Sequence, residues 1–176
     1  MKRLRPPMDA EELARAYAAP HDHTKWSDHV YRVDRTIAFA REYLGAVETV
    51  ADLSCGSGAI ARALVESPIL GDLAPGYDYC GPIEETVQAV PYVDAFVCCE
   101  TLEHLDDPQS VLNAIRLKAG RLILSTPVEA WDDNNPEHYW AWSREDVEGL
   151  LAAAGFSVDA YDEVWAFYRF GLWGCS

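Results

Sequence analysis

Residues 50–58, VADLSCGSG, contain the pattern that decides the fold of this chain. A short apolar run ends in the acidic residue Asp52, and a turn of small residues then leads into a stretch of helix formers. Small residues let backbone N–H groups approach a ligand closely, and a helix N-terminus behind them adds partial positive charge. The turn has Gly56 and Gly58 but not the full dinucleotide fingerprint G-x-G-x-x-G. From these residues alone, a ligand-binding turn and a purely structural strand-to-helix turn both remain open.

Short apolar runs alternate with helical stretches on either side of this turn. The expected strands are 47–53, 69–72, 77–80, 93–99, 121–126, 156–161 and 163–171, and the expected helices are 58–66, 108–118 and 143–154. Apolar strands separated by helices indicate an α/β protein with a mostly parallel sheet covered on both faces. The last two strands lie too close in sequence for a crossover. We therefore expect a C-terminal antiparallel hairpin that turns near Asp162.

The first 45 residues have a different pattern, with two predicted helices and no predicted strand. A capping pattern predicts a helix over 9–18, and the helical spacing of apolar residues predicts a second helix over 28–44. A chain of 176 residues has room for one compact core. We divide it into an N-terminal helical extension, 1–45, expected to act as a lid, and a ligand-binding domain, 46–176.

Three histidines, His21, His23 and His29, lie in or beside the loop between the two predicted helices. A solvated loop, a lid over the site and a metal site are all compatible with them. Arg32 follows on the second helix, where it either forms a surface ion pair or reaches an anionic group of a bound ligand.

Charge is distributed unevenly along the chain, whose formal net charge is −15. Residues 1–45 hold eight Lys/Arg and seven Asp/Glu, so residues 46–176 hold the remaining six and 22. A strongly acidic body repels phosphate backbones, and we therefore do not expect tight generic binding of nucleic acid.

Cysteine usage and hydropathy bear on the compartment. The five cysteines are an odd number, and no secretory signal is recognisable at the N-terminus. No apolar run approaches the roughly 20 residues of a membrane span. We expect reduced thiols in a cytoplasmic protein that has no membrane partner.

Several segments resemble, in order, the motifs of one enzyme family. They are DLSCGSG (52–58), LGDLAP (70–75), GPIEE (81–85), VDAFVCCETLEHLDDP (93–108), LILSTP (122–127) and LAAAGF (151–156). This ordered set resembles class I S-adenosylmethionine-dependent methyltransferases over about residues 46–160. The resemblance implies a Rossmann-like methyltransferase fold. The fold is expected to be trimmed between its second and third strands, where the chain leaves no room for the usual helix.

The same resemblance implies S-adenosylmethionine as the cofactor and indicates which residues bind it. These are Asp52, Ser54, Gly56, Gly58, Asp72, Ile83 and Cys99. Asp72 would accept hydrogen bonds from the ribose hydroxyls, with Asp78 as a rival for that role. Ile83 would cover the adenine face, and Asp52 would lie under the turn or contact the ammonium of the cofactor tail.

Glu100, Glu103 and His104 follow the fourth predicted strand in an E-x-x-E-H pattern, and His138 follows later. In ubiquinone-pathway O-methyltransferases a similar pattern is a packing motif near the active site. In small-RNA 2′-O-methyltransferases a similar set, with a later histidine, holds a divalent metal. For this chain, Glu100, Glu103, His104 and His138 are therefore candidate ligands of Mg²⁺, Mn²⁺ or Zn²⁺. Without a metal, His104 or His138 is the candidate general base.

We expect methyl transfer from S-adenosylmethionine to an oxygen atom of a small molecule. The aromatic-rich C-terminal third can wall an acceptor pocket. The acidic loop over 131–136 is a candidate for acceptor recognition. The alternatives are a metal-dependent 2′-O-methyltransferase acting on RNA and a catalytically inactive S-adenosylmethionine-binding protein.

Overall fold

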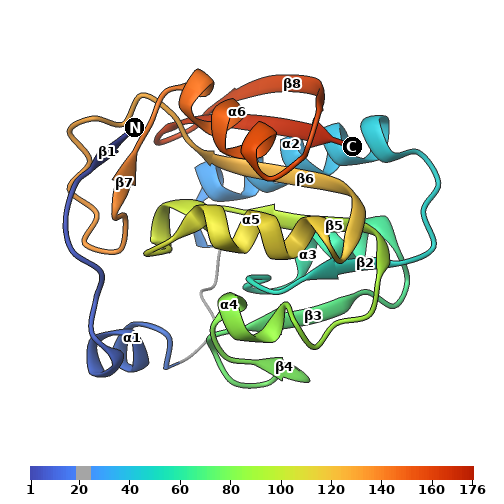
Figure 1. Ribbon diagram of the computed structural model, residues 1–176, viewed down its shortest axis with the longest axis horizontal. Helices are drawn as coiled ribbons and strands as arrows, with labels where there is room; N and C mark the ends of the chain where they lie inside the picture. The colour runs from blue at the N-terminus through green and yellow to red at the C-terminus, as the bar shows by residue number, and fades with distance from the viewer. Residues whose placement is uncertain (19–24) are drawn as a thin grey trace.

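The computed structural model describes residues 1–18 and 25–176, so His21 and His23 lie outside the described residues. Within them, a seven-stranded sheet has the order β4-β3-β2-β5-β6-β9-β8 (Figure 1). The strands are β2 Val50–Asp52, β3 Ile69–Asp72, β4 Tyr79–Cys80, β5 Val93–Cys99, β6 Ala119–Pro127, β8 Val158–Trp165 and β9 Arg169–Cys175. Neighbours from β4 to β6 pair in parallel, whereas β9 pairs antiparallel with both β6 and β8. The expected mostly parallel sheet is confirmed.

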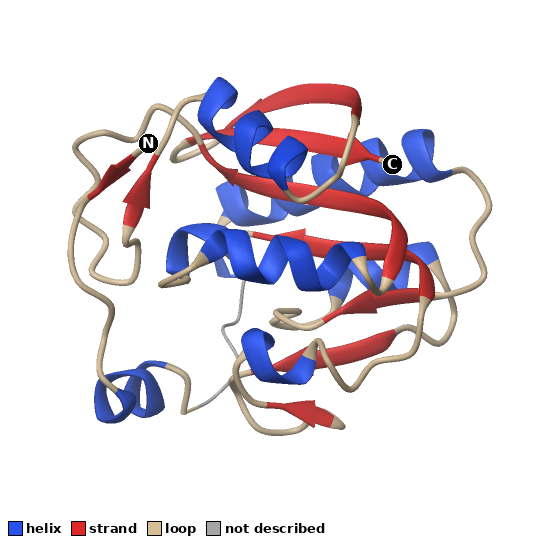
Figure 2. Cartoon of the chain, viewed as in Figure 1, coloured by secondary structure: helices blue, strands red, loops and turns tan. Residues whose placement is uncertain are grey.

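Helices cover both faces of the sheet (Figure 2). They are α2 Ser27–Leu44, α3 Ala59–Leu64, α4 Ile83–Thr86, α5 Pro108–Arg116 and α6 Arg144–Ala153. Alternate side chains of β5 pack into different cores on the two faces of the sheet. Ala95 and Val97 belong to a buried cluster that includes residues of α2 and α3. Phe96 and Cys98 belong to the other cluster, with residues of α4, α5 and α6. Side chains of a strand alternate between the two faces of its sheet, so one apolar run supplies both cores.

The C-terminal hairpin is confirmed, but its expected turn near Asp162 is wrong. The chain turns over residues 166–168, and Asp162 and Glu163 lie within β8. Both carboxylates have cationic partners there, because Asp162 pairs with Arg35 and Glu163 pairs with Arg169. β8 is an edge strand, and charged residues at an edge are compatible with strand structure.

The connection between β3 and β4 contains no helix in the described chain, which confirms the trimming expected on this side. The order of the strands positions a site at their carboxyl ends. From β2 the chain first adds β3 and β4 on one side of the sheet and then returns to add β5 and β6 on the other side. The strand order therefore reverses beside β2. Ligands of open α/β sheets bind beyond the carboxyl ends of the strands at such a switch point.

Residues 1–17 form a strap, which the sequence analysis did not predict. β1 Lys2–Arg3 pairs antiparallel with β7 Trp140–Ala141, and α1 Ala10–Ala16 follows with Asp9 as its N-cap. By contrast, α2 is part of the core, because its residues Ala40 and Leu44 are buried against the sheet. None of the helices in the described part of the chain combines the length and apolarity that a bilayer crossing requires.

Candidate active site

The carboxyl ends of β2, β3 and β5 open into a cavity of about 420 Å³. Its walls come from the turn after β2, the end of β3, the start of α4, the segment after β5, and the hairpin tip between β8 and β9. Leu13 and Tyr17 from the N-terminal strap and His29 and Arg32 from α2 close one side. A volume of this size suits a small ligand.

The turn after β2 is held by hydrogen bonds from its backbone. The Gly56 N–H donates to Asp72 Oδ2 at 2.8 Å, and the Ser54 N–H donates to Asp52 Oδ1 at 3.2 Å. Gly58 does not line the cavity; it caps α3 in a left-handed conformation with φ 74°. This left-handed φ favours glycine, and a Cβ atom there would lie 2.9 Å from Leu70 Cδ1 and from Arg62 Nε, two side-chain atoms that would have to shift. The Ser54 hydroxyl lies 2.6 Å from the Thr101 hydroxyl, which links this turn to the segment after β5.

Asp72 and Asp78, the two rivals for a ribose contact, lie in different environments. Asp72 ends β3, is buried and lines the cavity. Its Oδ1 accepts from the Ala74 N–H at 2.9 Å, so both carboxylate oxygens have backbone donors. Each carboxylate oxygen has two lone pairs, so capacity for a ligand hydroxyl remains. Asp78 is exposed and does not line the cavity.

Three other residues expected to bind a cofactor also lie on the cavity wall. Ile83, in the first turn of α4, and Cys99, the last residue of β5, are buried and line it. Asp52 lines it as well. Burial raises the pKa of Asp52 to about 7. The hydrogen bond from the Ser54 amide lowers this pKa, and the nearby Asp72 carboxyl raises it further. A cationic ligand group beside Asp52 would therefore strengthen its ionisation.

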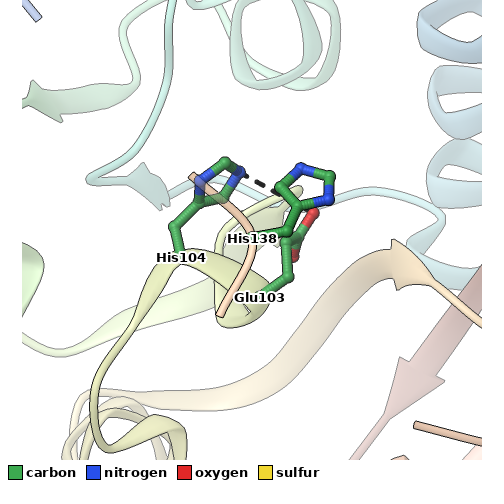
Figure 3. A group of neighbouring side chains, drawn as sticks. All are labelled: Glu103, His104 and His138. Atoms are coloured by element: carbon green, nitrogen blue, oxygen red, sulfur yellow. Dashed lines mark ion pairs between the residues drawn. The ribbon is translucent and has the colours of Figure 1, made fainter. Parts of the chain in front are cut away.

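A second group of polar side chains lines the part of the cavity formed by the segment after β5 and the segment before β7. Glu103, His104 and His138 each offer one ligand atom, and these atoms all lie within 4.8 Å of one another (Figure 3). Glu103 and His104 come from the 3-10 turn Leu102–His104, and His138 comes from the segment before β7. Thr126 donates a hydrogen bond to Glu103 Oε2 at 2.9 Å, whereas Glu103 Oε1 makes no hydrogen bond among the described residues. Burial, reinforced by the Glu100 carboxyl, raises the pKa of Glu103 well above its usual range.

Asp133 orients His138 and was not singled out by the sequence. Its Oδ2 lies 2.5 Å from His138 Nδ1, and its Oδ1 accepts from the Tyr168 hydroxyl at 2.7 Å. Burial opposes ionisation of Asp133, but bonds from the Asn135 amide, Tyr168 and His138 outweigh it and lower its pKa. An ionised Asp133 accepts a hydrogen bond from Nδ1–H, so the unprotonated nitrogen of a neutral His138 is Nε2.

The loop that contains Asp133 is fixed from a distant part of the chain. Arg5 donates to the backbone carbonyls of Asp133 and Asn135. The Leu4 N–H donates to the Tyr139 carbonyl at 2.8 Å. Asp133 lies in the acidic loop expected to contact the acceptor. Asp133 and His138 are only five residues apart, and this proximity was the signal that the sequence offered. A spacing of five residues does not by itself establish that two side chains are in contact.

Glu100 is separate from the Glu103, His104 and His138 group. It is in a left-handed conformation with φ 54°, and its Oε1 accepts from the Ser125 hydroxyl at 2.6 Å. Arg32 Nη1 lies 3.7 Å from the same oxygen. Burial raises the pKa of Glu100, opposed chiefly by Arg32. Three of the four expected metal ligands thus come together, and Glu100 is directed to Arg32 and Ser125 instead.

Comparisons with known proteins agree with this arrangement. The sequence profile of a family described as "Methyltransferase domain" matches residues 25–161, which is most of the chain. The chain belongs to this methyltransferase family. A comparison with curated protein sequences found no match.

Solved structures with the same fold include three methyltransferases. The N-methyltransferase NodS from Bradyrhizobium japonicum, in complex with S-adenosylhomocysteine, has a TM-score of 0.71 and 16% identity, covering 94% of this chain and 96% of that one. Magnesium protoporphyrin IX methyltransferase from Synechocystis has a TM-score of 0.63 and 16% identity, covering 94% and 93%. The 1,6-didemethyltoxoflavin N1-methyltransferase from Burkholderia thailandensis has a TM-score of 0.66 and 16% identity, covering 98% and 92%.

The expected Rossmann-like methyltransferase fold is confirmed by the sheet order and by these neighbours. The chain is thus a member of a methyltransferase family, and solved neighbours that share its fold hold S-adenosylhomocysteine. Its family match begins at residue 25 and therefore includes α2, whereas α1 and β1 lie before it.

Proposed function

We propose that this methyltransferase transfers the methyl group to an oxygen atom of a small molecule and that His138 removes the proton from that oxygen. The observation that carries this proposal is the contact of 2.5 Å between Asp133 Oδ2 and His138 Nδ1. An alcohol or phenol must lose its proton to accept a methyl group, and a positioned imidazole is suited to take it. The contact leaves Nε2 of His138 as the proton acceptor at the wall of the cavity.

The cofactor is proposed to lie across the turn after β2. Asp72 would accept from the ribose hydroxyls, and Ile83 would cover the adenine. Ser54 and Gly56 would approach the methionine part, with Asp52 beneath. Gly58 supports this binding indirectly by capping α3. Cys99 would line the end of β5 beneath the cofactor. The placement of these residues around one cavity supports the assignment.

The reaction then has a simple balance. The acceptor hydroxyl gives its proton to His138 Nε2 as its oxygen bonds to the methyl carbon, and the bond between sulfur and that carbon breaks. The products are a methyl ether or ester, neutral S-adenosylhomocysteine and a protonated His138. The Asp133 carboxylate stabilises the imidazolium. Holding the acceptor and the methyl group in line supplies much of the rate enhancement.

Compact acceptors are favoured by the size of the site. The cavity of about 420 Å³ includes the space assigned to the cofactor. It lies toward the lower end of the roughly 300–1,000 Å³ that is typical of small-molecule sites. Phe167, Tyr168 and Phe170 give the acceptor end an aromatic wall. We propose that the strap, with Leu13 and Tyr17 on the cavity wall, acts as the lid.

The test uses matched acceptors that differ only in the accepting group. The protein is incubated with methyl-labelled S-adenosylmethionine and either phenols or the corresponding anilines. We expect S-adenosylhomocysteine to form with hydroxyl compounds and the label to appear on oxygen. His138→Gln should abolish this transfer while leaving S-adenosylhomocysteine binding intact. Transfer to the anilines alone, unaffected by His138→Gln, would contradict the proposal.

Metal-dependent 2′-O-methylation of RNA is a second candidate function, favoured by the group of Glu103, His104 and His138. Two imidazoles and a carboxylate are suitable ligands for a divalent metal, and Glu103 Oε1 has no hydrogen bond among the described residues. The Asp133–His138 contact is also the arrangement that orients metal-binding histidines. A metal bound there would polarise the hydroxyls of the acceptor sugar.

Electrostatics favour the small-molecule function, because residues 46–176 hold 22 acidic and six basic residues. The two candidates are separated by titrating the protein with Mn²⁺ or Zn²⁺ and comparing Glu103→Gln with Glu129→Gln, a change at an exposed residue. Stoichiometric binding lost only in Glu103→Gln, together with methylation of an RNA 3′ end, would favour the second function. Transfer to phenols that persists in EDTA would favour the first.

A further inference from the structure

The segment that carries His138 has little regular structure of its own. It lies in the connection between β6 and β7, and it contains short-range turns such as the bond from the Asn135 N–H to Asp133 Oδ1 at 2.8 Å. From the side of the sheet, the Glu103 carbonyl accepts from the Tyr139 N–H at 2.7 Å. Fixing each residue of such a segment costs conformational entropy, so its contacts with neighbouring elements decide how firmly it is held.

The N-terminal strap contacts this segment on both sides of His138. Before it in the chain, the carbonyls of Asp133 and Asn135 accept hydrogen bonds from Arg5. After it, β7 pairs with β1 of the strap. The match to the methyltransferase family begins at residue 25, so the strap lies outside the matched residues. A part of the chain that the family profile does not cover therefore holds the segment of the proposed base.

The guanidinium of Arg5 joins the two backbone groups on which the orientation of His138 depends. Nη2 donates to the carbonyl of Asp133, whose carboxylate contacts His138 Nδ1. Nη1 donates to the carbonyl of Asn135, and this carbonyl also accepts from the His138 backbone N–H at 3.2 Å. A guanidinium presents its N–H groups in a rigid plane. It therefore fixes the relative positions of the two carbonyls, and with them the ring of His138 and its partner Asp133.

Arg5 does not line the cavity, whereas His138 does. The bonds that Arg5 makes to this segment go to backbone carbonyls, and no reacting atom lies within its reach. Any influence of Arg5 on methyl transfer must therefore act through the position of other groups. Such an influence can be large, because a displacement of about 1 Å in an active site can cost on the order of 100-fold in rate.

We propose that Arg5 is a positioning residue for proton removal and that the strap completes the active site around His138. This inference rests on the proposed function, because it takes His138 as the proton acceptor. Without the Arg5 guanidinium the two carbonyls are no longer held together, and Asp133 no longer keeps the His138 ring in one orientation. Transfer to acceptors that need the base then slows, whereas acceptors that are already ionised react as before.

The activity test compares two acceptors that differ in acidity. Phenol, with a pKa of about 10, must lose its proton during transfer, whereas 4-nitrophenol is largely ionised at pH 8 and needs no base. Arg5→Met should lower kcat for phenol by about 10- to 100-fold with little change in KM, and should leave transfer to 4-nitrophenol within about twofold of wild type. Arg5→Lys should be intermediate, because an ammonium keeps the charge without the planar fork. A residue with a purely structural role would affect both acceptors alike.

Arg15→Met is the matched control in the same strap. Arg15 lies in α1, is exposed and pairs with Glu11 of the same helix at 3.8 Å. Its replacement should leave transfer to both acceptors unchanged. Calorimetry with S-adenosylhomocysteine checks that each variant is folded, and the affinity should stay at the wild-type value. Should Arg5→Met not fold, Arg5→Lys carries the comparison.

A second measurement does not depend on turnover. Nitrogen-15 NMR of the histidine rings at pH 8 in EDTA, assigned with His138→Gln, reports which ring nitrogen carries the proton. Wild-type His138 should carry it on Nδ1, and Arg5→Met should show a mixture of the two tautomers.

The proposal is overturned if Arg5→Met leaves phenol turnover unchanged, if it slows both acceptors equally, or if the His138 tautomer is the same in both proteins. Failure of the proposed function looks different. In that case wild-type protein methylates neither phenol, or transfer to phenol survives in His138→Gln, and the tautomer comparison alone decides whether Arg5 positions His138.

Discussion

The two ends of the cavity are built in different ways. The cofactor end comes from the turn after β2 and the end of β3, where both oxygens of Asp72 accept backbone hydrogen bonds. The acceptor end brings together residues from distant segments, among them Glu103 and His138. The first is a local structure that one motif encodes, and the second exists only after the chain has folded.

The two ends also differ in how fully their polar groups are satisfied. Asp72 makes its hydrogen bonds within the protein, which preorganises the turn. Arg32 Nε and Glu103 Oε1 are buried and make no hydrogen bond among the described residues. Buried polar groups without partners are costly and typically mark positions where a ligand completes the structure. The comparison supports the proposal that the first end binds the cofactor and that the second determines which acceptor reacts.

The largest effect is expected at the acceptor end. His138→Ala should lower turnover by about 10²- to 10⁴-fold, because a general base contributes on that scale. The affinity for S-adenosylhomocysteine, measured by calorimetry, should stay within a few fold of wild type. His104→Ala is the companion variant, since its ring centre lies 4.7 Å from that of His138. A larger loss of turnover in His104→Ala than in His138→Ala would assign the base to His104 instead.

At the cofactor end, Asp72→Ala should weaken S-adenosylhomocysteine binding by about 10- to 100-fold. The change removes the side-chain acceptor proposed for the ribose hydroxyls and also releases the Gly56 N–H. Asp78→Ala is the control, because Asp78 is exposed and lies outside the cavity wall. Equal losses in the two variants, measured by calorimetry, would show that the cofactor binds elsewhere.

The sequence predicted the fold and the turn after β2 more completely than it predicted the arrangement of polar side chains around His138. The strand, turn and helix over 50–58 are local, and the apolar alternation in β5 is dictated by the two cores. The turn expected near Asp162 was wrong because Asp162 and Glu163 lie within β8, where Arg35 and Arg169 neutralise their charges. Local patterns do not carry such pairings.

The acceptor end was predicted as a set of residue types without their partners. His138 was recognised, but Asp133 was interpreted only as part of an acidic loop. Their contact depends on a turn that Arg5 and Tyr168 hold from opposite ends of the chain. Arg32 remained open between a surface ion pair and a ligand contact, and its burial depends on how α2 packs beside β9. Burial and orientation are tertiary properties, so they required the structure.

A smaller effect is expected from pH at the cofactor end. Asp52, with its pKa raised to about 7 by burial, is largely neutral at pH 6 and largely ionised at pH 8. If it contacts the ammonium of the cofactor tail, S-adenosylhomocysteine should bind about tenfold more tightly at pH 8 than at pH 6. The unliganded protein has the opposite dependence. The folded state holds the Asp52 proton more tightly than the unfolded chain, so this group's contribution to stability falls as pH rises from about 4 to 7.

Calorimetry between pH 6 and 8 measures the first dependence, and denaturant unfolding across the lower range measures the second. Asp52→Asn is the matched variant, because it is isosteric and does not titrate. Its affinity should be flat with pH after correction for buffer ionisation. A slope that persists in Asp52→Asn would assign the dependence to a different group and remove the proposed contact with the tail.

The smallest effects are expected from two tyrosines, one that hydrogen-bonds at each end of the cavity. Tyr77 donates a hydrogen bond to the Gly56 carbonyl, and Tyr168 donates one to Asp133 Oδ1. Loss of one such bond is worth about 0.5–1.5 kcal/mol, or roughly two- to tenfold. Tyr77→Phe should therefore weaken S-adenosylhomocysteine binding and leave turnover at saturation unchanged. Tyr168→Phe should lower turnover and leave S-adenosylhomocysteine binding unchanged, because a less firmly held Asp133 orients His138 poorly without contacting the cofactor.

Calorimetry and steady-state turnover are measured on both variants. If binding and proton removal are separable, Tyr77→Phe changes only the affinity and Tyr168→Phe changes only the turnover. If each variant altered both quantities alike, the two ends would act as one cooperative unit, and the division drawn between them would fail.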